Sequence, residues 1–299
     1  ADNPAAVATM VQAERFPGQT GTPIEIIIFD GAQKTDEIAQ YAQRIAAIDG
    51  IVAVVPPQVI GSDVRVVAYQ EMLPRTPESQ KLIHDIRGVK APAGTLVGGV
   101  AADYTDSQDG IADTLPWAFG WIALSVLILV FIFTGSIILP IKAVLLNVLS
   151  LGATMGVLTW VFIDGNLQWL VGSFTVTGSL DTSIVILIAV VVFGLSMDYE
   201  LFLLSRIREE HLQGRSNVES VATGLQRSAR IITAAAVLLA VVFAAFVTSG
   251  VTSIKTMGFG VALAVILDAT LIRALLVPAL MRLFGERNWW APKSMQRFT

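Results

Sequence analysis

Four ionisable side chains lie within long apolar stretches of the sequence: Asp198, Glu200, Asp268 and Arg273. Placing such a group at the centre of a membrane-spanning helix costs roughly 2.5–3.5 kcal/mol on insertion scales, so a functional role is the first interpretation. A carboxylate that loses its hydration favours its neutral form, which allows it to take up and release a proton. These residue types therefore predict proton transfer inside a membrane.

Asp198 lies in the apolar segment Phe193–Ser205, too far from the inner arginines to reach the membrane surface easily. Gly194, one helical turn earlier on the same face, would permit close approach of a neighbouring helix. The hydroxyl of Tyr199 can donate to a partner carboxylate or bridge to water. We predict that Asp198 and Tyr199 relay protons. The alternative is that Asp198 makes an interhelical hydrogen bond that serves packing only.

The other three charges are predicted to support this relay. Glu200 is closer to the inner arginines, so it is either functional or an ordinary interfacial carboxylate. Asp268 and Arg273 are five residues apart, about 140° around an α-helix, so they are not expected to pair as residues four apart do. They would instead bridge to different neighbours, or meet through rotamers and water. Both a role in coupling and a structural ion pair stay open.

The composition indicates that most of the chain is embedded in a membrane. Of the 299 residues, 54% are apolar and 15% are charged, and the mean hydropathy is +0.67. A soluble domain carries about 25% charged residues. Residues 1–116 contain 8 Lys and Arg against 15 Asp and Glu, and the remainder contain 12 against 9. An acidic domain thus precedes an apolar, slightly basic part, and no basic stripe predicts a nucleic-acid partner.

The chain has no cysteine, and its histidines are His84 and His211. Disulfides, thiolate metal sites and cysteine nucleophiles are therefore excluded, and neither a histidine-based metal site nor a cofactor is expected. The sequence begins at Ala1 without a signal peptide, although its first domain precedes a membrane span. We therefore expect the chain to be a fragment of a longer polypeptide.

Residues 23–100 alternate short strands with short helices. Strands are expected at 23–29, 51–55, 64–69 and 95–100, and helices are expected to begin near Thr35 and at Thr76-Pro77. Thr is a good N-cap, and Pro is favoured at the first helical position. The order β-α-β-β-α-β predicts a ferredoxin-like split βαβ unit, and the alternative is another small α/β sandwich.

Five segments are long enough to cross the hydrocarbon core, which takes about 20 apolar residues. They cover about 117–134, 143–163, 182–204, 231–249 and 256–284. Between the third and fourth segments, Ser216 and Glu219 form a capping-box pattern, which predicts a separate short amphipathic helix on the inner surface. Residues 285–299 are expected to form a cytoplasmic tail.

The distribution of Lys and Arg predicts the orientation of the spans. If residues 1–116 lie outside the cell, ten of these basic residues are on the inner side, whereas the outer loops 164–181 and 250–255 contain only Lys255. Because Lys and Arg favour the cytoplasmic side, the N-terminal domain is expected to be extracytoplasmic and the C-terminus cytoplasmic. The short loop 250–255 predicts an antiparallel hairpin of the last two spans. We expect a multi-pass protein of the plasma membrane.

The segment Phe193–Glu210, FGLSMDYELFLLSRIREE, contains Asp198, Tyr199 and Glu200. It resembles the signature helix of the MMPL family (mycobacterial membrane protein large) of the RND superfamily of transporters. The likeness continues through residues 231–236, 267–273, 277–280 and 288–292 and covers residues 20–295 in all.

The resemblance implies two pseudo-repeated halves, each with one span, a porter domain and five further spans. This chain would then be a C-terminal half without its first span. In the family, an Asp-Tyr pair on the fourth helix meets one on the tenth, and the two pairs relay protons; Asp198 and Tyr199 match the tenth-helix pair. The implied function is export of lipids or glycolipids to the cell envelope, driven by the proton-motive force. The implied partners are membrane lipids, protons and the N-terminal half.

Two other functions are considered. A SecDF-like translocation accessory has the same superfamily topology and proton coupling, but the match around Asp198-Tyr199-Glu200 favours MMPL. An intramembrane aspartyl protease would use Asp198 and Asp268 as its dyad. Such proteases carry a Gly-x-Gly-Asp motif, whereas Ser-Met precedes Asp198 in this chain. We therefore expect a transporter and not an enzyme.

Overall fold

The computed structural model describes residues 11, 15, 21–176 and 179–292. The chain divides into two compact units, residues 1–116 and 117–299. Residues 293–299, which include Lys293 and Arg297 of the expected cytoplasmic tail, lie outside the described residues.

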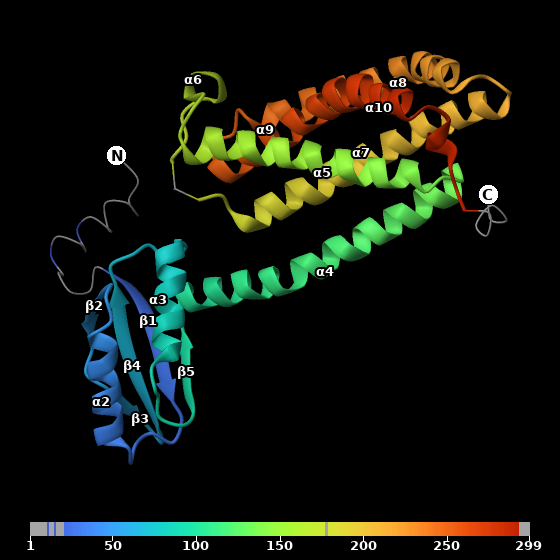
Figure 1. Ribbon diagram of the computed structural model, residues 1–299. Helices are drawn as coiled ribbons and strands as arrows, with labels where there is room; N and C mark the ends of the chain where they lie inside the picture. The colour runs from blue at the N-terminus through green and yellow to red at the C-terminus, as the bar shows by residue number, and fades with distance from the viewer. Residues whose placement is uncertain (1–10, 12–14, 16–20, 177–178, 293–299) are drawn as a thin grey trace. The chain divides into compact units, whose positions relative to one another are not determined.

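The first unit contains an antiparallel sheet and two helices that cover one of its faces (Figure 1). Its elements are β1 (Thr22–Ile28), α2 (Thr35–Ala46), β2 (Ile51–Val54), β3 (Gln58–Ile60), β4 (Asp63–Gln70), α3 (Pro77–Gly88) and β5 (Thr95–Gly98). The strand order is β2-β4-β1-β5, and β3 pairs with β4. The four expected strands are present. The additional strand β3 forms because the chain pairs with β4 again after Pro56-Pro57 and turns at Gly61.

The core of the first unit lies between the sheet and the two helices. Alternate residues of β1, namely Ile24, Ile26 and Ile28, are completely buried, and they belong to one cluster with Tyr41 of α2 and Ile83 of α3. This alternation is the period of two that a strand with one covered face requires.

Within the described residues, five helices are long and apolar enough to cross a membrane, the number predicted. They are α4 (Val100–Thr134); α5 (Ile138–Leu158) with the π-helix η1 (Thr159–Ile163); α7 (Thr182–Leu212); α8 (Asn217–Phe246); and the run formed by α9 (Thr252–Leu267), the π-helix η2 (Asp268–Leu276), α10 (Val277–Phe284) and the 3₁₀-helix η3 (Gly285–Trp289). A short helix, α6 (Gln168–Val171), lies between η1 and α7.

Helix α8 differs from the expectation of a separate amphipathic helix. The predicted capping box between Ser216 and Glu219 is present, but the helix that it begins continues without a break to Phe246. The reason is a close crossing with α7. A Cβ atom at Gly224 would lie 2.7 Å from Cγ1 and 2.9 Å from the backbone nitrogen of Ile207. This contact holds the start of α8 along the end of α7, so both belong to the same bundle.

Helices α8 and α9 form the predicted hairpin, joined by residues 247–251. Gly258 allows the two helices to approach closely, because a Cβ atom there would lie 2.6 Å from the carbonyl oxygen of Phe243. Small residues at such positions are typical of helix packing in membranes.

Lys255 is not in the loop, where the sequence placed it. Helix α9 begins at Thr252, and the Lys255 ammonium is buried, donating to the carbonyl oxygens of Val171 and Ser173 at 3.0 and 3.1 Å. These two hydrogen bonds compensate for the lost hydration of the ammonium group. Helix α9 can therefore begin at Thr252 and include the buried Lys255 in its first turn.

Candidate functional site

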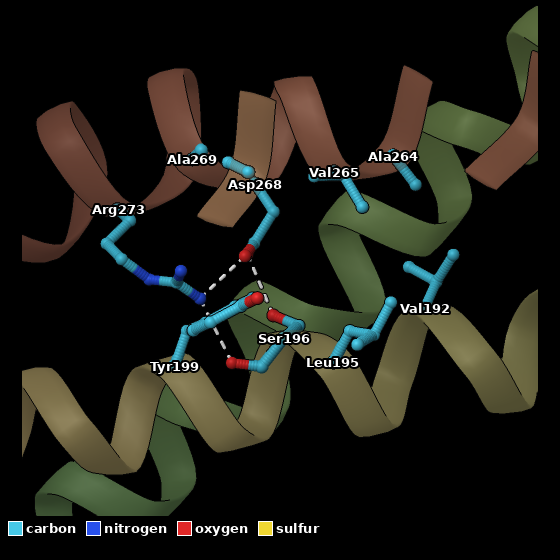
Figure 2. A pocket seen from close by; sticks show the side chains of 10 residues that line it. Val192, Leu195, Ser196, Tyr199, Ala264, Val265, Asp268, Ala269 and Arg273 are labelled. Carbon is cyan, nitrogen blue, oxygen red and sulfur yellow. Dashed lines mark hydrogen bonds and ion pairs between the residues drawn. The ribbon is translucent and has the colours of Figure 1, made fainter. Parts of the chain in front are cut away.

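Three of the predicted site residues, Tyr199, Asp268 and Arg273, meet Ser196 in one cluster between α7 and η2 (Figure 2). The Asp268 carboxylate accepts hydrogen bonds from the Ser196 hydroxyl at 2.8 Å and from the Arg273 guanidinium at 2.6 Å. Arg273 also donates to the backbone carbonyl of Ser196 at 3.0 Å, and its guanidinium carbon lies 5.2 Å from the centre of the Tyr199 ring. Asp268 and Arg273 are only 5% and 3% exposed, so this ion pair is shielded from its surroundings.

Asp268 and Arg273 form the ion pair that the sequence left open, although residues five apart were not expected to pair as residues four apart do. That expectation assumed α-helical geometry, whereas the backbone from Asp268 to Leu276 is a π-helix. A π-helix closes its hydrogen bonds between residues five apart, which brings such residues onto one face. Single π-turns occur frequently at functional sites, so the distortion itself marks this region.

A cavity of about 10 Å³ borders the cluster. Its polar lining comes from the four residues of the cluster, and its apolar lining consists of Val192, Leu195, Ala236, Ala264, Val265 and Ala269. The space is about that of one water molecule, and the polar groups around it supply the partners that a buried water needs. Figure 2 shows Ser196 and Tyr199 extending from α7 toward Asp268 on η2. The cavity can therefore hold one water molecule beside the ion pair.

Glu200 is buried between α7 and α5. It is 6% exposed, and its carboxylate accepts a hydrogen bond from the side-chain amide of Asn147 at 3.4 Å. It also interacts electrostatically with Arg273 and Asp268. Glu200 is therefore a buried carboxylate within the bundle, and its supporting role stays a prediction.

Asp198 lies on a different side of α7. It is exposed, and it is not among the described residues that line the cavity beside Asp268. Gly194 is exposed on the same face, with open space around the position of a Cβ atom. Successive residues of a helix are about 100° apart, so the side chains of Asp198 and Tyr199 necessarily diverge. Of the predicted relay pair, Asp198 thus lies on an uncovered face of α7, and Tyr199 lies beside the Asp268–Arg273 ion pair.

Two residues of this site, Ser196 and Asn147, were not predicted from the sequence. Ser196 occurs one turn before Glu200, and Asn147 is the one amide side chain within α5. A small polar residue in an apolar helix is a weak signal, because it often bonds its own backbone. Here Ser196 donates to Asp268, and Asn147 donates both to its own backbone at Ala143 and to Glu200.

The geometry does not suit an aspartyl protease dyad. Asp268 is occupied by Arg273 and Ser196, whereas Asp198 is exposed on another face of α7. Among the described residues, no group of three or more His, Asp or Glu is placed to hold a metal ion. The arrangement is suited to moving a proton and to transmitting a change of charge between helices.

The model of the MMPL family matches residues 1–298. The chain belongs to the MMPL family. The trehalose monomycolate exporter MmpL3 of Mycobacterium tuberculosis is 37% identical over 301 residues, covering 94% of this chain and 31% of the relative. The mycolic acid-containing lipids exporter MmpL11 of Mycolicibacterium smegmatis is 36% identical over 296 residues, covering 94% and 31%. The membrane protein SCO6666 of Streptomyces coelicolor is 44% identical over 221 residues, covering 74% and 31%.

Membership of the MMPL family confirms the resemblance first seen at Phe193–Glu210. MMPL proteins are membrane transporters and not enzymes, and five apolar helices agree with a multi-pass protein of the cell membrane. This MMPL chain spans about a third of the length of these relatives, 31% in each case.

Proposed function

We propose that this MMPL chain is the C-terminal half of an exporter driven by the proton-motive force, which moves lipids or glycolipids to the cell envelope. The observation that carries the proposal is the exposed carboxylate of Asp198 on the membrane-spanning helix α7. A charge facing hydrocarbon costs roughly 2.5–3.5 kcal/mol on insertion scales, so this face is expected to meet a polar partner rather than lipid.

A helix of the N-terminal half is the partner that this face suits. Gly194 leaves space for close approach one turn from Asp198. By the resemblance to the family, the approaching helix carries a second Asp-Tyr pair. In transporters built from repeats, the coupling site lies near the midplane where the two repeats meet. Asp198 therefore serves as the proton-binding group at that interface.

The buried cluster on the other side of α7 is proposed to transmit the protonation state of Asp198. Tyr199 follows Asp198 directly and contacts Arg273, which in turn bonds Asp268 and the backbone of Ser196. A proton gained at Asp198 removes a negative charge next to this chain of contacts. The resulting change in electrostatic potential alters the strength of the Asp268–Arg273 ion pair. This favours a different position of α7 relative to η2.

The first unit is proposed to be an extracytoplasmic porter domain of the ferredoxin-like type. Its strand order β2-β4-β1-β5 and its two helices on one face support that fold. The distribution of Lys and Arg supports its position outside the cell. Exposed tryptophans at both ends of the spans, such as Trp121, Trp169 and Trp290, suit the membrane interfaces.

The names of the relatives support a lipid cargo. MmpL3 of M. tuberculosis is named for trehalose monomycolate and MmpL11 of M. smegmatis for mycolic acid-containing lipids. Both are large amphiphiles, and an amphiphile leaving a membrane needs a protein path that covers its acyl chains. We therefore propose an amphiphilic lipid or glycolipid as the substrate class.

The test is lipid export by the full-length transporter with Asp198→Asn, under an imposed pH gradient. The amide keeps the shape of the side chain but cannot cycle a proton, so we expect export and proton uptake to stop while expression and membrane insertion stay normal. Glu209→Gln, at an exposed acid further along α7, is the matched control and should export normally. Near-normal export by Asp198→Asn would refute the proposal. If Asp198→Asn abolished protein secretion but left lipid export intact, the result would favour the SecDF-like alternative.

A further inference from the structure

We propose that Glu200 is the proton-release group of this transporter, which passes the proton from the Asp198 side of α7 to the cytoplasm through a cavity beside Lys142. This inference rests on the proposed proton-driven function and adds to it an exit path. The path is built from groups on α5, α7, η2 and α10.

Glu200 lines a second water-sized cavity, which is distinct from the one beside Asp268 and Arg273. Beyond the cavity at Asp268 and Arg273, a second cavity of about 10 Å³ has Glu200 and Lys142 as its charged lining. The rest of that lining is apolar: Leu139, Leu146, Leu204, Val277, Leu280 and Met281. Glu200 lines the second cavity directly and interacts electrostatically with the ion pair that lines the first. A buried carboxylate beside a water-sized space is suited to release a proton to water.

Lys142 marks the inner end of this path. Its ammonium donates to the carbonyl oxygen of Leu280 at 3.3 Å and to the side chain of Asn288, and it lies 3.9 Å from the centre of the Phe284 ring. These partners belong to the end of the bundle where α5 begins and α10 ends. In the proposed orientation this end faces the cytoplasm. Lys142 is only partly buried, so the second cavity lies close to the inner surface.

The order of residues around α7 explains how a proton reaches Glu200. Asp198, Tyr199 and Glu200 are consecutive, so they point in directions about 100° apart, with Tyr199 between the two acids. Asp198 is exposed, Tyr199 is half-buried and Glu200 is buried. A hydroxyl can donate one proton while it accepts another, so Tyr199 can connect the two acids around the helix.

The proton balance of the cycle closes. Because the three side chains diverge, water connects them: protonated Asp198 gives its proton through water to the hydroxyl of Tyr199, which transfers its own proton through water to the Glu200 carboxylate. Glu200 then releases the proton to water beside Lys142, and all three groups return to their starting states. Lys142 lines the cavity into which Glu200 releases the proton, and the Asn147 amide donates a hydrogen bond to the Glu200 carboxylate.

The first experiment measures proton flux in proteoliposomes that contain the full-length transporter and an internal pH dye. We expect Glu200→Gln to lower the flux on the order of 100-fold, the scale of a lost proton-transfer group. Glu200→Asp, which keeps a carboxylate, should restore part of the flux, and Glu209→Gln should match the wild type. Wild-type flux in Glu200→Gln would overturn the release role and leave Asp198 untouched. Absence of flux in the wild type would overturn the proposed function, and this inference with it.

A second experiment uses the wild-type protein, so its result does not depend on the folding of a variant. A hydrophobic carbodiimide modifies protonated carboxyl groups in apolar surroundings, and mass spectrometry locates the modified residue. In wild-type proteoliposomes with the two sides buffered separately, modification of Glu200 should follow the pH of the cytoplasmic side. Modification of Asp198 should follow the pH of the outer side. Dependence of Glu200 on the outer pH alone would overturn the proposed exit path.

Discussion

The hydroxyl of Ser196 on α7 donates a 2.8 Å hydrogen bond to the carboxylate of Asp268 on η2. The backbone carbonyl of the same serine accepts from Arg273 at 3.0 Å. One small residue therefore contacts both members of the buried ion pair. Because Ser196 is two residues from Asp198, a movement of α7 must either carry η2 with it or break these bonds.

Ser196→Ala should lower the stability of the transporter. The substitution removes a hydrogen bond to a charged group, which contributes about 1.5–3 kcal/mol. The thermal unfolding midpoint of the full-length protein in detergent measures the effect. Ser205→Ala, at a partly buried serine of the same helix, is the control and should leave the midpoint almost unchanged. Equal midpoints for the two variants would show that the Ser196 bond contributes no stability.

Breaking the Asp268–Arg273 pair on one side should cost more than replacing both residues. Arg273→Met leaves a buried carboxylate without its cation, for which a cost of about 3–5 kcal/mol is expected. Adding Asp268→Asn removes the stranded charge and should recover part of that loss. Unfolding midpoints of the two single variants and the double variant give the coupling energy. Additive effects would mean that the contact at 2.6 Å does not stabilise the fold.

The sequence predicted most parts of the fold that depend on local signals, although the expected cap at Thr35 is absent, because Thr35 is itself the first residue of α2 and follows Lys34 at the N-cap. Thr76 accepts the hydrogen bond from the backbone N–H of Ser79, and Pro77 is the first residue of α3, as the capping rule requires. The capping box at Ser216 is likewise present. The number of spans followed from hydropathy, because each span must satisfy its own backbone in lipid.

Other features depend on tertiary contacts that no local pattern reveals. The π-helix at Asp268 has the sequence of an ordinary apolar helix, so its effect on Arg273 was not predicted. The continuity of α8 depends on the approach of Gly224 to Ile207 of another helix. The sequence therefore identifies the charged residues, but which of them pair depends on the backbone conformation.

The ion pair between Glu25 and Arg65 should make the stability of the first unit depend on pH. Arg65 donates to both carboxylate oxygens at 2.7 Å, which holds the pKa of Glu25 below its ordinary value of 4.5. A lowered pKa stabilises the fold above pH 4.5, and this contribution is lost as the pH falls through the lowered value.

Hydrogen exchange of β1 and β4 in the full-length protein, corrected for intrinsic rates, measures this effect. At neutral pH the wild type should be better protected than Glu25→Gln, and the difference should shrink as the pH falls below 4.5 and through the lowered pKa of Glu25. Glu37→Gln, at an exposed glutamate of α2, should behave as the wild type throughout. A difference that grows at low pH would contradict the assignment.

The orientation of the chain can be tested with cysteines, because the chain has none of its own. Ser62→Cys lies in the exposed turn between β3 and β4, and Gln213→Cys lies in the exposed turn between α7 and α8, where it spares the capping box. In intact cells an impermeant maleimide should label position 62 alone, because the Lys and Arg bias places the second turn inside. Labelling of position 213 without permeabilisation would reverse the proposed topology.

Two glycines of the bundle should respond differently to substitution. At Gly224, a Cβ atom would meet the backbone of Ile207 at 2.9 Å, and backbone cannot move aside. Gly224→Ala should therefore destabilise the protein by about 1–3 kcal/mol through overpacking. At Gly194, no described atom lies within 4 Å of the Cβ position, so this chain alone gives no reason for a glycine there.

We predict that Gly194 is required by a helix of the N-terminal half that packs beside Asp198. In the full-length transporter, Gly194→Ala should be mild, because one methyl group is small and Ala favours the helix by up to about 1 kcal/mol. Gly194→Leu should separate the two helices and abolish lipid export and proton flux, although the contacts within this chain stay intact. Export assays combined with unfolding midpoints distinguish this result from the misfolding expected of Gly224→Ala. Full export by Gly194→Leu would mean that lipid, not protein, covers this face of α7.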